Sequence, residues 1–115
     1  MSMLELSTHR LPGCTVIRVV GDVDITTATK LDLAVEEGLL SGEPLILDVG
    51  DMAFLDSTGL SVLLKAHVAA ERDGGGLHVA APQPVPRRIF QVTGVLSHLH
   101  LYDSLDEAIR VAVPT

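Results

Sequence analysis

The sequence predicts a single α/β domain, with a small mixed sheet of four or five strands and helices packed mainly on one face. Residues 45–49 form a compact apolar run, residues 60–68 place apolar side chains at helical spacing, and residues 77–81 are again apolar. A strand, a helix and a strand in this order form a parallel crossover. The 115 residues suit one domain over 1–115, with a core from about 4 to 112.

The flanking segments supply the remaining elements. An antiparallel pair is expected before the crossover, because a turn at Leu11-Pro12-Gly13 separates two short apolar segments. Thr26 or Thr27 is expected to cap the helix that follows, and Ser104 to Glu107 is a capping box for the last helix. The expected elements are strands at 3–8 and 14–20, helices at 28–39 and 87–93, an edge strand at 96–102 and a last helix from 105.

Composition narrows the function classes. The formal net charge of −7 disfavours nucleic-acid binding, and Arg87-Arg88 is too small a basic patch to track phosphates. An acidic chain instead suits a basic protein partner. The sequence has no apolar run of membrane-spanning length and no signal peptide, so we expect a cytoplasmic location and no membrane partner. Cys14 is the only cysteine, which excludes an internal disulfide and indicates a half-buried strand residue.

The segment Asp56-Ser57-Thr58-Gly59 places a carboxylate and two hydroxyl groups where the central helix begins. The first N–H groups of a helix lack partners inside the helix and carry partial positive charge. They accept either a capping side chain, here Asp56 or Ser57, or a phosphate.

Four acidic residues are predicted to gather around Ser57, because loops after parallel strands meet at one edge of a sheet. We expect several of them within about 8–10 Å of Ser57, which is one Debye length. They are Asp22, Asp24, Asp51 and Asp56.

The histidines offer weaker hypotheses. His67 is interpreted as a partly buried histidine with its hydrogen bonds satisfied, and the pair His98 and His100 lacks further ligands, so no metal or other cofactor is expected. A hydrolase using Ser57 with His67 or His78 is a poor alternative, because the sequence lacks the Gly-x-Ser-x-Gly elbow.

Three motifs carry a resemblance to a known family. Asp56-Ser57-Thr58-Gly59-Leu60, after the strand Leu45-Ile46-Leu47-Asp48, resembles the core motif of the STAS domain of bacterial anti-sigma-factor antagonists. Gly21-Asp22-Val23-Asp24 is similar to that family's Gly-Glu-Leu-Asp element, with Asp22 where Glu is usual. Gly75 to Val79 resembles the strand after the central helix, so the likeness runs from about Leu4 to Ala112.

The resemblance implies a regulatory binding module without catalysis of its own. Its unphosphorylated form would bind an ATP-dependent anti-sigma factor serine kinase and release the sigma factor. Phosphorylation at Ser57, with Thr58 as the alternative acceptor, would end binding, and a PP2C-type phosphatase would reset it. Gly59 would let the partner approach the backbone closely. The implied partner-binding residues are Asp22, Asp24, Asp56, Ser57, Thr58, Gly59 and Ser61.

Two questions stay open at this level. The chain is expected to be a monomer or a weak dimer. The alternative function is a non-phosphorylated STAS subunit of a larger assembly, such as a lipid-transport complex or a sensor scaffold, because one fold serves several roles.

Overall fold

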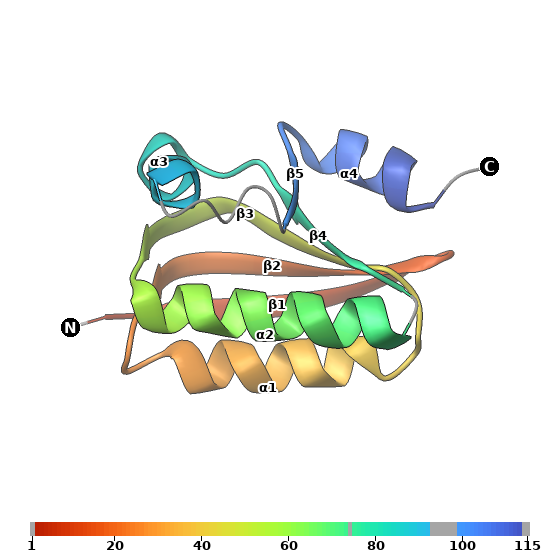
Figure 1. Ribbon diagram of the computed structural model, residues 1–115, viewed down its shortest axis with the longest axis horizontal. Helices are drawn as coiled ribbons and strands as arrows, with labels where there is room; N and C mark the ends of the chain where they lie inside the picture. The colour runs from red at the N-terminus through yellow and green to blue at the C-terminus, as the bar shows by residue number, and fades with distance from the viewer. Residues whose placement is uncertain (1, 74, 93–98, 114–115) are drawn as a thin grey trace.

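The computed structural model describes residues 2–73, 75–92 and 99–113. They form a mixed sheet of five strands with four helices (Figure 1), which confirms the predicted α/β class. The elements are β1 (Leu4–Leu11), β2 (Cys14–Val23), α1 (Ala28–Leu39), β3 (Leu45–Leu55), α2 (Ser57–Asp73), β4 (Leu77–Ala80), α3 (Pro84–Val92), β5 (His100–Tyr102) and α4 (Leu105–Ala112).

The strands lie in sequence order across the sheet. The strand β1 is antiparallel to β2, whereas β2, β3, β4 and β5 are mutually parallel. The predicted antiparallel pair and the predicted parallel crossover from β3 through α2 to β4 are therefore confirmed. In this arrangement the carboxyl ends of β2 and β3 lie together, and each leads into a helix on the same side.

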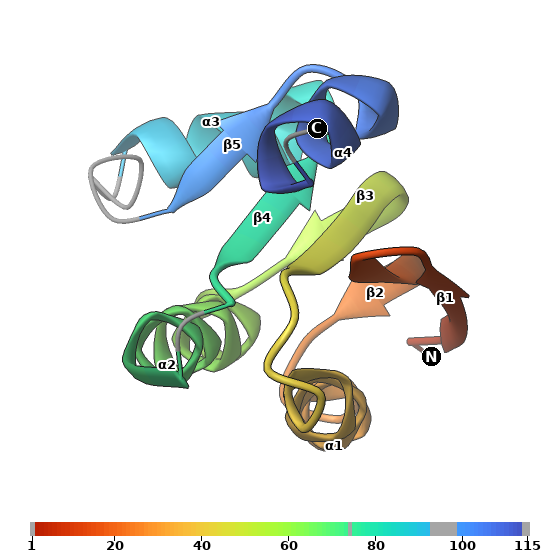
Figure 2. The ribbon, with the colours of Figure 1, turned by 90° about the vertical axis from the view of Figure 1, so that its right-hand side faces the viewer.

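The two long helices, α1 and α2, lie side by side on one face of the sheet (Figure 2). Their buried side chains, including Leu31, Val35 and Leu63, pack with Leu47 and Val79 of the sheet in the larger core. On the opposite face α4 covers a smaller cluster, which contains Cys14, Val16, Ile46, Ala80 and Ala108. Helices α1 and α2 thus cover one face, Phe90 of α3 joins the same core, and α4 covers one end of the other face.

The largest departure from the sequence prediction is the length of β3. The apolar run at residues 45–49 predicted a strand that ends at Val49, but the strand continues to Leu55. The pairing shifts from Arg18 opposite Asp48 to Val20 opposite Asp51, so β3 carries an extra residue here. Such a bulge bends the strand without ending it, which explains why Gly50-Asp51 resembles a turn in the sequence.

Other boundaries differ by a few residues. The strand β1 extends to Leu11 and β2 to Val23, and α3 begins at Pro84, three residues before the predicted start. Proline is tolerated there because the first turn of a helix needs no N–H donor. Predicted structure at residues 93–98, including His98, lies outside the described residues.

Two further observations concern burial and length. Cys14 is buried rather than half-buried, and burial, with Glu43 nearby, raises the pKa of its thiol. No helix in the described ranges combines the length and the hydrophobicity that crossing a bilayer requires.

Candidate functional site

The candidate site lies where β2 and β3 end. Asp22 pairs with Phe54 and Val23 with Leu55, which are the last paired residues of the two strands. Beyond them the backbone N–H of Asp56 donates to the carbonyl oxygen of Val23 at 3.1 Å. This bond joins the end of β2 to the residue that precedes α2.

Asp56 caps the helix that begins at Ser57. Its Oδ1 accepts the backbone N–H of Thr58 at 2.9 Å and that of Gly59 at 3.1 Å, which confirms the predicted cap. Ser57 is the first residue of α2 and is exposed, whereas Thr58 is half-buried. The hydroxyl of Ser61, one turn further, donates to the carbonyl oxygen of Ser57 at 2.9 Å. The cap is therefore formed by the carboxylate and leaves the Ser57 side chain at the surface.

The structure corrects the prediction for Gly59. This residue is buried, so it presents no open backbone to a partner. A Cβ atom at this position would lie 2.5 Å from Cδ1 of Leu55 and 2.6 Å from Cγ1 of Val23. Glycine is needed because the first turn of α2 packs directly on the ends of β2 and β3.

The loop from Asp24 to Thr27 is held by side-chain hydrogen bonds. Oδ1 of Asp24 accepts the N–H of Thr26 at 2.8 Å and its hydroxyl at 2.6 Å. The hydroxyl of Thr27 accepts the N–H of Asp24 at 3.0 Å and donates to the carbonyl oxygen of Asp22 at 2.8 Å. Thr27 occupies the N-cap position of α1 but makes no side-chain cap bond, so the predicted capping role is wrong.

The same loop and the end of β2 before it also make hydrogen bonds with Ser2 and Met3. The hydroxyl of Ser2 donates to Oδ2 of Asp24, and the carbonyl oxygen of Met3 accepts the N–H of Asp22 at 2.9 Å. Donation by Ser2, together with donation by Thr26, lowers the pKa of Asp24 to about 2. The Asp24 carboxylate is therefore ionised and fixed at neutral pH.

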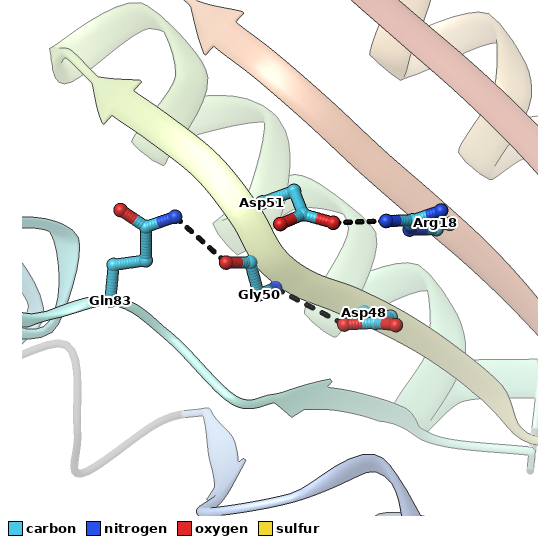
Figure 3. A network of polar contacts seen from close by, with 5 residues as sticks. All are labelled: Arg18, Asp48, Gly50, Asp51 and Gln83. Atoms are coloured by element: carbon cyan, nitrogen blue, oxygen red, sulfur yellow. Dashed lines mark hydrogen bonds and ion pairs between the residues drawn. The ribbon is translucent and has the colours of Figure 1, made fainter.

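Asp51 does not join this group, contrary to the prediction. It lies inside β3, four residues before Leu55, or about 13 Å at the rise of a strand. Its carboxylate pairs with Arg18 of β2, as Figure 3 shows. Nearby, Oδ1 of Asp48 accepts the N–H of Gly50 at 3.1 Å and Nε2 of Gln83 donates to the Gly50 carbonyl at 2.7 Å, so the bulge is held from both sides.

Three histidines, His67, His78 and His100, lie near one another where β4 pairs with β5. The rings of His78 and His100 stack with centroids 5.4 Å apart, and Nδ1 of His78 lies 2.9 Å from the Tyr102 hydroxyl. The prediction that His67 is satisfied is wrong, because among the described residues its buried Nδ1 has no hydrogen-bond partner and Oε1 of Glu71 lies 4.0 Å away. No group of three potential metal ligands converges within the described ranges.

These positions also argue against the hydrolase alternative. His67 follows Ser57 by ten residues on α2, or about 15 Å along the helix axis. His78 pairs with Ile46, nine residues before the end of β3, or about 30 Å along the strand. Neither imidazole can act on the Ser57 hydroxyl from these positions.

Sequence reasoning missed several residues of this region. Ser2 and Thr27 bond to Asp24. Met3 and Phe54, which flank Asp22, and Ile25, which follows Asp24, have apolar side chains that are 67%, 45% and 77% exposed. If the predicted strand had been extended to Leu55, its pairing with β2 would have placed Phe54 next to Asp22 at this site. Exposed apolar side chains at a strand end are typical of contact surfaces.

Comparisons with known proteins agree with this architecture. A family model described as "STAS domain" matches residues 5–108. The anti-sigma F factor antagonist of Paenibacillus polymyxa is 25% identical over 103 residues, which cover 88% of this chain and 86% of that protein. The crystal structure of an anti-sigma factor antagonist from Mycobacterium paratuberculosis superimposes with a TM-score of 0.88 at 27% identity, covering 96% of this chain and 94% of that one.

A third similarity concerns a protein solved after modification. The Bacillus cell fate determinant SpoIIAA in its phosphorylated form superimposes with a TM-score of 0.71 at 21% identity, covering 96% of this chain and all of that one (100%), which supports the fold alone. One assignment follows from the strand order, from the helix that begins at Ser57 and from the family match over residues 5–108. The chain belongs to the STAS domain family.

Proposed function

We propose that this chain is an anti-sigma factor antagonist whose binding is switched by phosphorylation of Ser57. In its unmodified form it binds an anti-sigma factor serine kinase in the cytoplasm and frees the sigma factor. The observation that carries the proposal is the exposed Ser57 hydroxyl at the start of α2, on a helix end already capped by Asp56. The similarity to anti-sigma factor antagonists supports it.

The Asp56 cap supports the proposal that the fold can carry a phosphate on Ser57. Asp56 already accepts the N–H groups of Thr58 and Gly59, so a phosphate on Ser57 does not replace any bond of the helix start. The added group carries about −1.5 to −2 charge and remains at the surface. The folded chain can therefore be modified at little cost in stability.

The same phosphate is expected to weaken binding to a partner protein. The carboxylates of Asp24 and Asp56 belong to the two segments that meet at this site, and the Asp24 carboxylate is ionised at neutral pH. A partner surface that fits a neutral hydroxyl would have to desolvate the phosphate beside them. A loss of about 3 kcal/mol at the interface corresponds to more than a hundredfold in affinity.

Exposure favours Ser57 over Thr58 as the acceptor. Ser57 is exposed, whereas Thr58 is half-buried and its N–H is bonded to Asp56. A kinase needs the acceptor hydroxyl in line with the γ-phosphate of ATP, which an exposed side chain permits. We therefore assign the modification to Ser57, and a PP2C-type phosphatase would remove it.

The test incubates the chain with an anti-sigma factor kinase of its own organism and ATP, and maps the phosphate by mass spectrometry. Phosphate is expected on wild type and on Thr58→Ala, and not on Ser57→Ala. Ser57→Ala is expected to bind the kinase as wild type does, and Ser57→Asp about a hundredfold more weakly. Equal binding of Ser57→Asp and wild type would refute the switch. Copurification with a membrane transporter instead of a kinase would favour a structural subunit.

A further inference from the structure

The sheet face opposite α1 and α2 is covered at one end only. Near the start of β2 and β3, Val16 and Ile46 pack under α4. Further along the same strands lie Arg18 and Asp51, which Figure 3 shows paired with each other. Their side chains are 52% and 51% exposed. This second half of the face therefore lies open to solvent.

The row of side chains nearest Ser57 combines one acid with two apolar groups. Asp22 bonds to the backbone of Met3 on one side and pairs with Phe54 on the other. Paired residues of neighbouring strands point to the same face, and the strands lie about 4.8 Å apart. Asp22 is therefore flanked by the side chains of Met3 and Phe54, which are 67% and 45% exposed.

The rows behind it are mainly acidic. Glu5 pairs with Val20 and Val20 with Asp51, and in the next row Arg18 pairs with Asp48. Arg18 neutralises Asp51, which leaves an excess of negative charge. We call this surface the acidic sheet face; it consists of Met3, Glu5, Arg18, Val20, Asp22, Asp48, Asp51 and Phe54.

The acidic sheet face is continuous with the phosphorylation site. Phe54 precedes Ser57 by three residues, and Asp22 precedes Asp24 by two. The last backbone bond between the two segments, from Asp56 to Val23, lies one step beyond the row of Asp22 and Phe54. One protein that contacts Ser57 can therefore also extend over this face.

We propose that the acidic sheet face receives a basic segment of the anti-sigma factor, with apolar side chains that pack on Phe54 and Met3, while the same protein contacts Ser57. This inference rests on the proposed function. Charge selects the occupant: the face carries four carboxylates and one guanidinium, and the whole chain has a net charge of −7. A second copy, nucleic acid and anionic lipid would all meet electrostatic repulsion.

The two kinds of side chain should act on different rate constants. Carboxylates at an interface mainly accelerate encounter, and this effect weakens as salt screens it. A buried aromatic side chain mainly slows dissociation. The acidic residues are therefore expected to govern the association rate constant and its salt dependence, and Phe54 the dissociation rate constant.

The first experiment removes charge. Stopped-flow binding to the anti-sigma factor is measured at low and high salt for wild type and for the triple variant Glu5→Gln/Asp22→Asn/Asp51→Asn. The matched control, Glu37→Gln/Glu43→Gln/Asp106→Asn, removes three exposed carboxylates elsewhere. We expect the first variant to associate about tenfold more slowly at low salt with a flatter salt dependence, and the control to stay within about threefold of wild type.

The second experiment removes apolar area. Phe54→Ala is expected to dissociate about tenfold faster, whereas Val68→Ala, which truncates a side chain 65% exposed on α2, should dissociate as wild type does. Urea unfolding of each variant confirms that it is folded at the assay temperature. If Ser57→Asp weakens binding while the triple variant and Phe54→Ala bind as their controls do, the acidic sheet face is refuted and the proposed function stands. If wild type binds no anti-sigma factor of its organism, both are refuted.

Discussion

Gly59 of α2 packs so closely on Val23 of β2 that a Cβ atom on the glycine would lie 2.6 Å from Cγ1 of the valine. Val23 also accepts, through its carbonyl oxygen, the N–H of Asp56. A side-chain contact and a backbone bond thus fix the first turn of α2 against the end of the neighbouring strand. The position of Ser57 relative to Asp24 follows from these two contacts.

Gly59→Ala is therefore expected to destabilise the fold. Overpacking costs about 1–3 kcal/mol, and the higher helix propensity of alanine returns at most about 1 kcal/mol. We expect a net loss of about 1–2 kcal/mol in the free energy of unfolding, measured by urea denaturation. Ser61→Ala, an exposed position on the same helix, serves as the control. Equal stability of Gly59→Ala and wild type would show that the contact with Val23 relaxes freely.

The cap of α2 gives a second prediction. Asp56→Ala removes the acceptor of two N–H groups and should cost about 1 kcal/mol of stability. Asp56→Asn keeps an oxygen at the Oδ1 position and loses only the interaction of the charge with the helix dipole, which contributes about 0.3–1 kcal/mol. The order of urea midpoints should be wild type, Asn, Ala. An alanine variant as stable as the asparagine variant would contradict the capping role.

Local sequence patterns were sufficient for much of this site. A carboxylate followed by two hydroxyl residues and an apolar helical repeat predicts a cap at Asp56 or Ser57, and in the structure Asp56 forms the cap while Ser57 is exposed. The crossover from β3 to β4 likewise follows from the order of apolar segments. In these cases the interactions that decide the structure lie within a few residues of one another.

Long-range pairing decided the features that were missed. Gly50-Asp51 has the composition of a turn, but its pairing with β2 continues β3 and carries Asp51 away from Ser57. The prediction for Thr27 failed for a similar reason at shorter range. Its hydroxyl bonds to the backbone of Asp22 and Asp24 instead of capping α1. A single sequence shows the donors and acceptors, and only the register shows which of them meet.

The lowered pKa of Asp24 gives a prediction about acid. Its pKa falls from 3.8 to about 2 because the hydroxyls of Ser2 and Thr26 donate to the carboxylate. As the pH falls, the unfolded state therefore takes up this proton at a higher pH than the folded state does. The stabilisation is complete above about pH 4 and is lost as the pH falls towards 2. Asp24→Asn should flatten the dependence of the urea midpoint on pH between about pH 4 and pH 2.

Glu37→Gln supplies the comparison for that experiment, because Glu37 is an exposed carboxylate on α1. Its pH profile should run parallel to that of wild type. Ser2→Ala should give an intermediate profile, since Thr26 still donates to Asp24. If the urea midpoints of wild type and Asp24→Asn changed in parallel with pH, the loss of stability in acid could not be assigned to Asp24.

His78 predicts a second loss of stability, at milder acidity. Burial, and then the neighbouring His100, lower the pKa of His78 from 6.5, against an opposing effect of Glu71. As the pH falls below about 6.5 the unfolded state takes up this proton first, so the stabilisation present above that pH declines. In wild type the urea midpoint should therefore fall more between pH 7.5 and 5.5 than in His78→Asn, whose side-chain amide can still bond to Tyr102. His9→Asn, at an exposed position on β1, should follow wild type, and an equal decline in His78→Asn would contradict the role of His78.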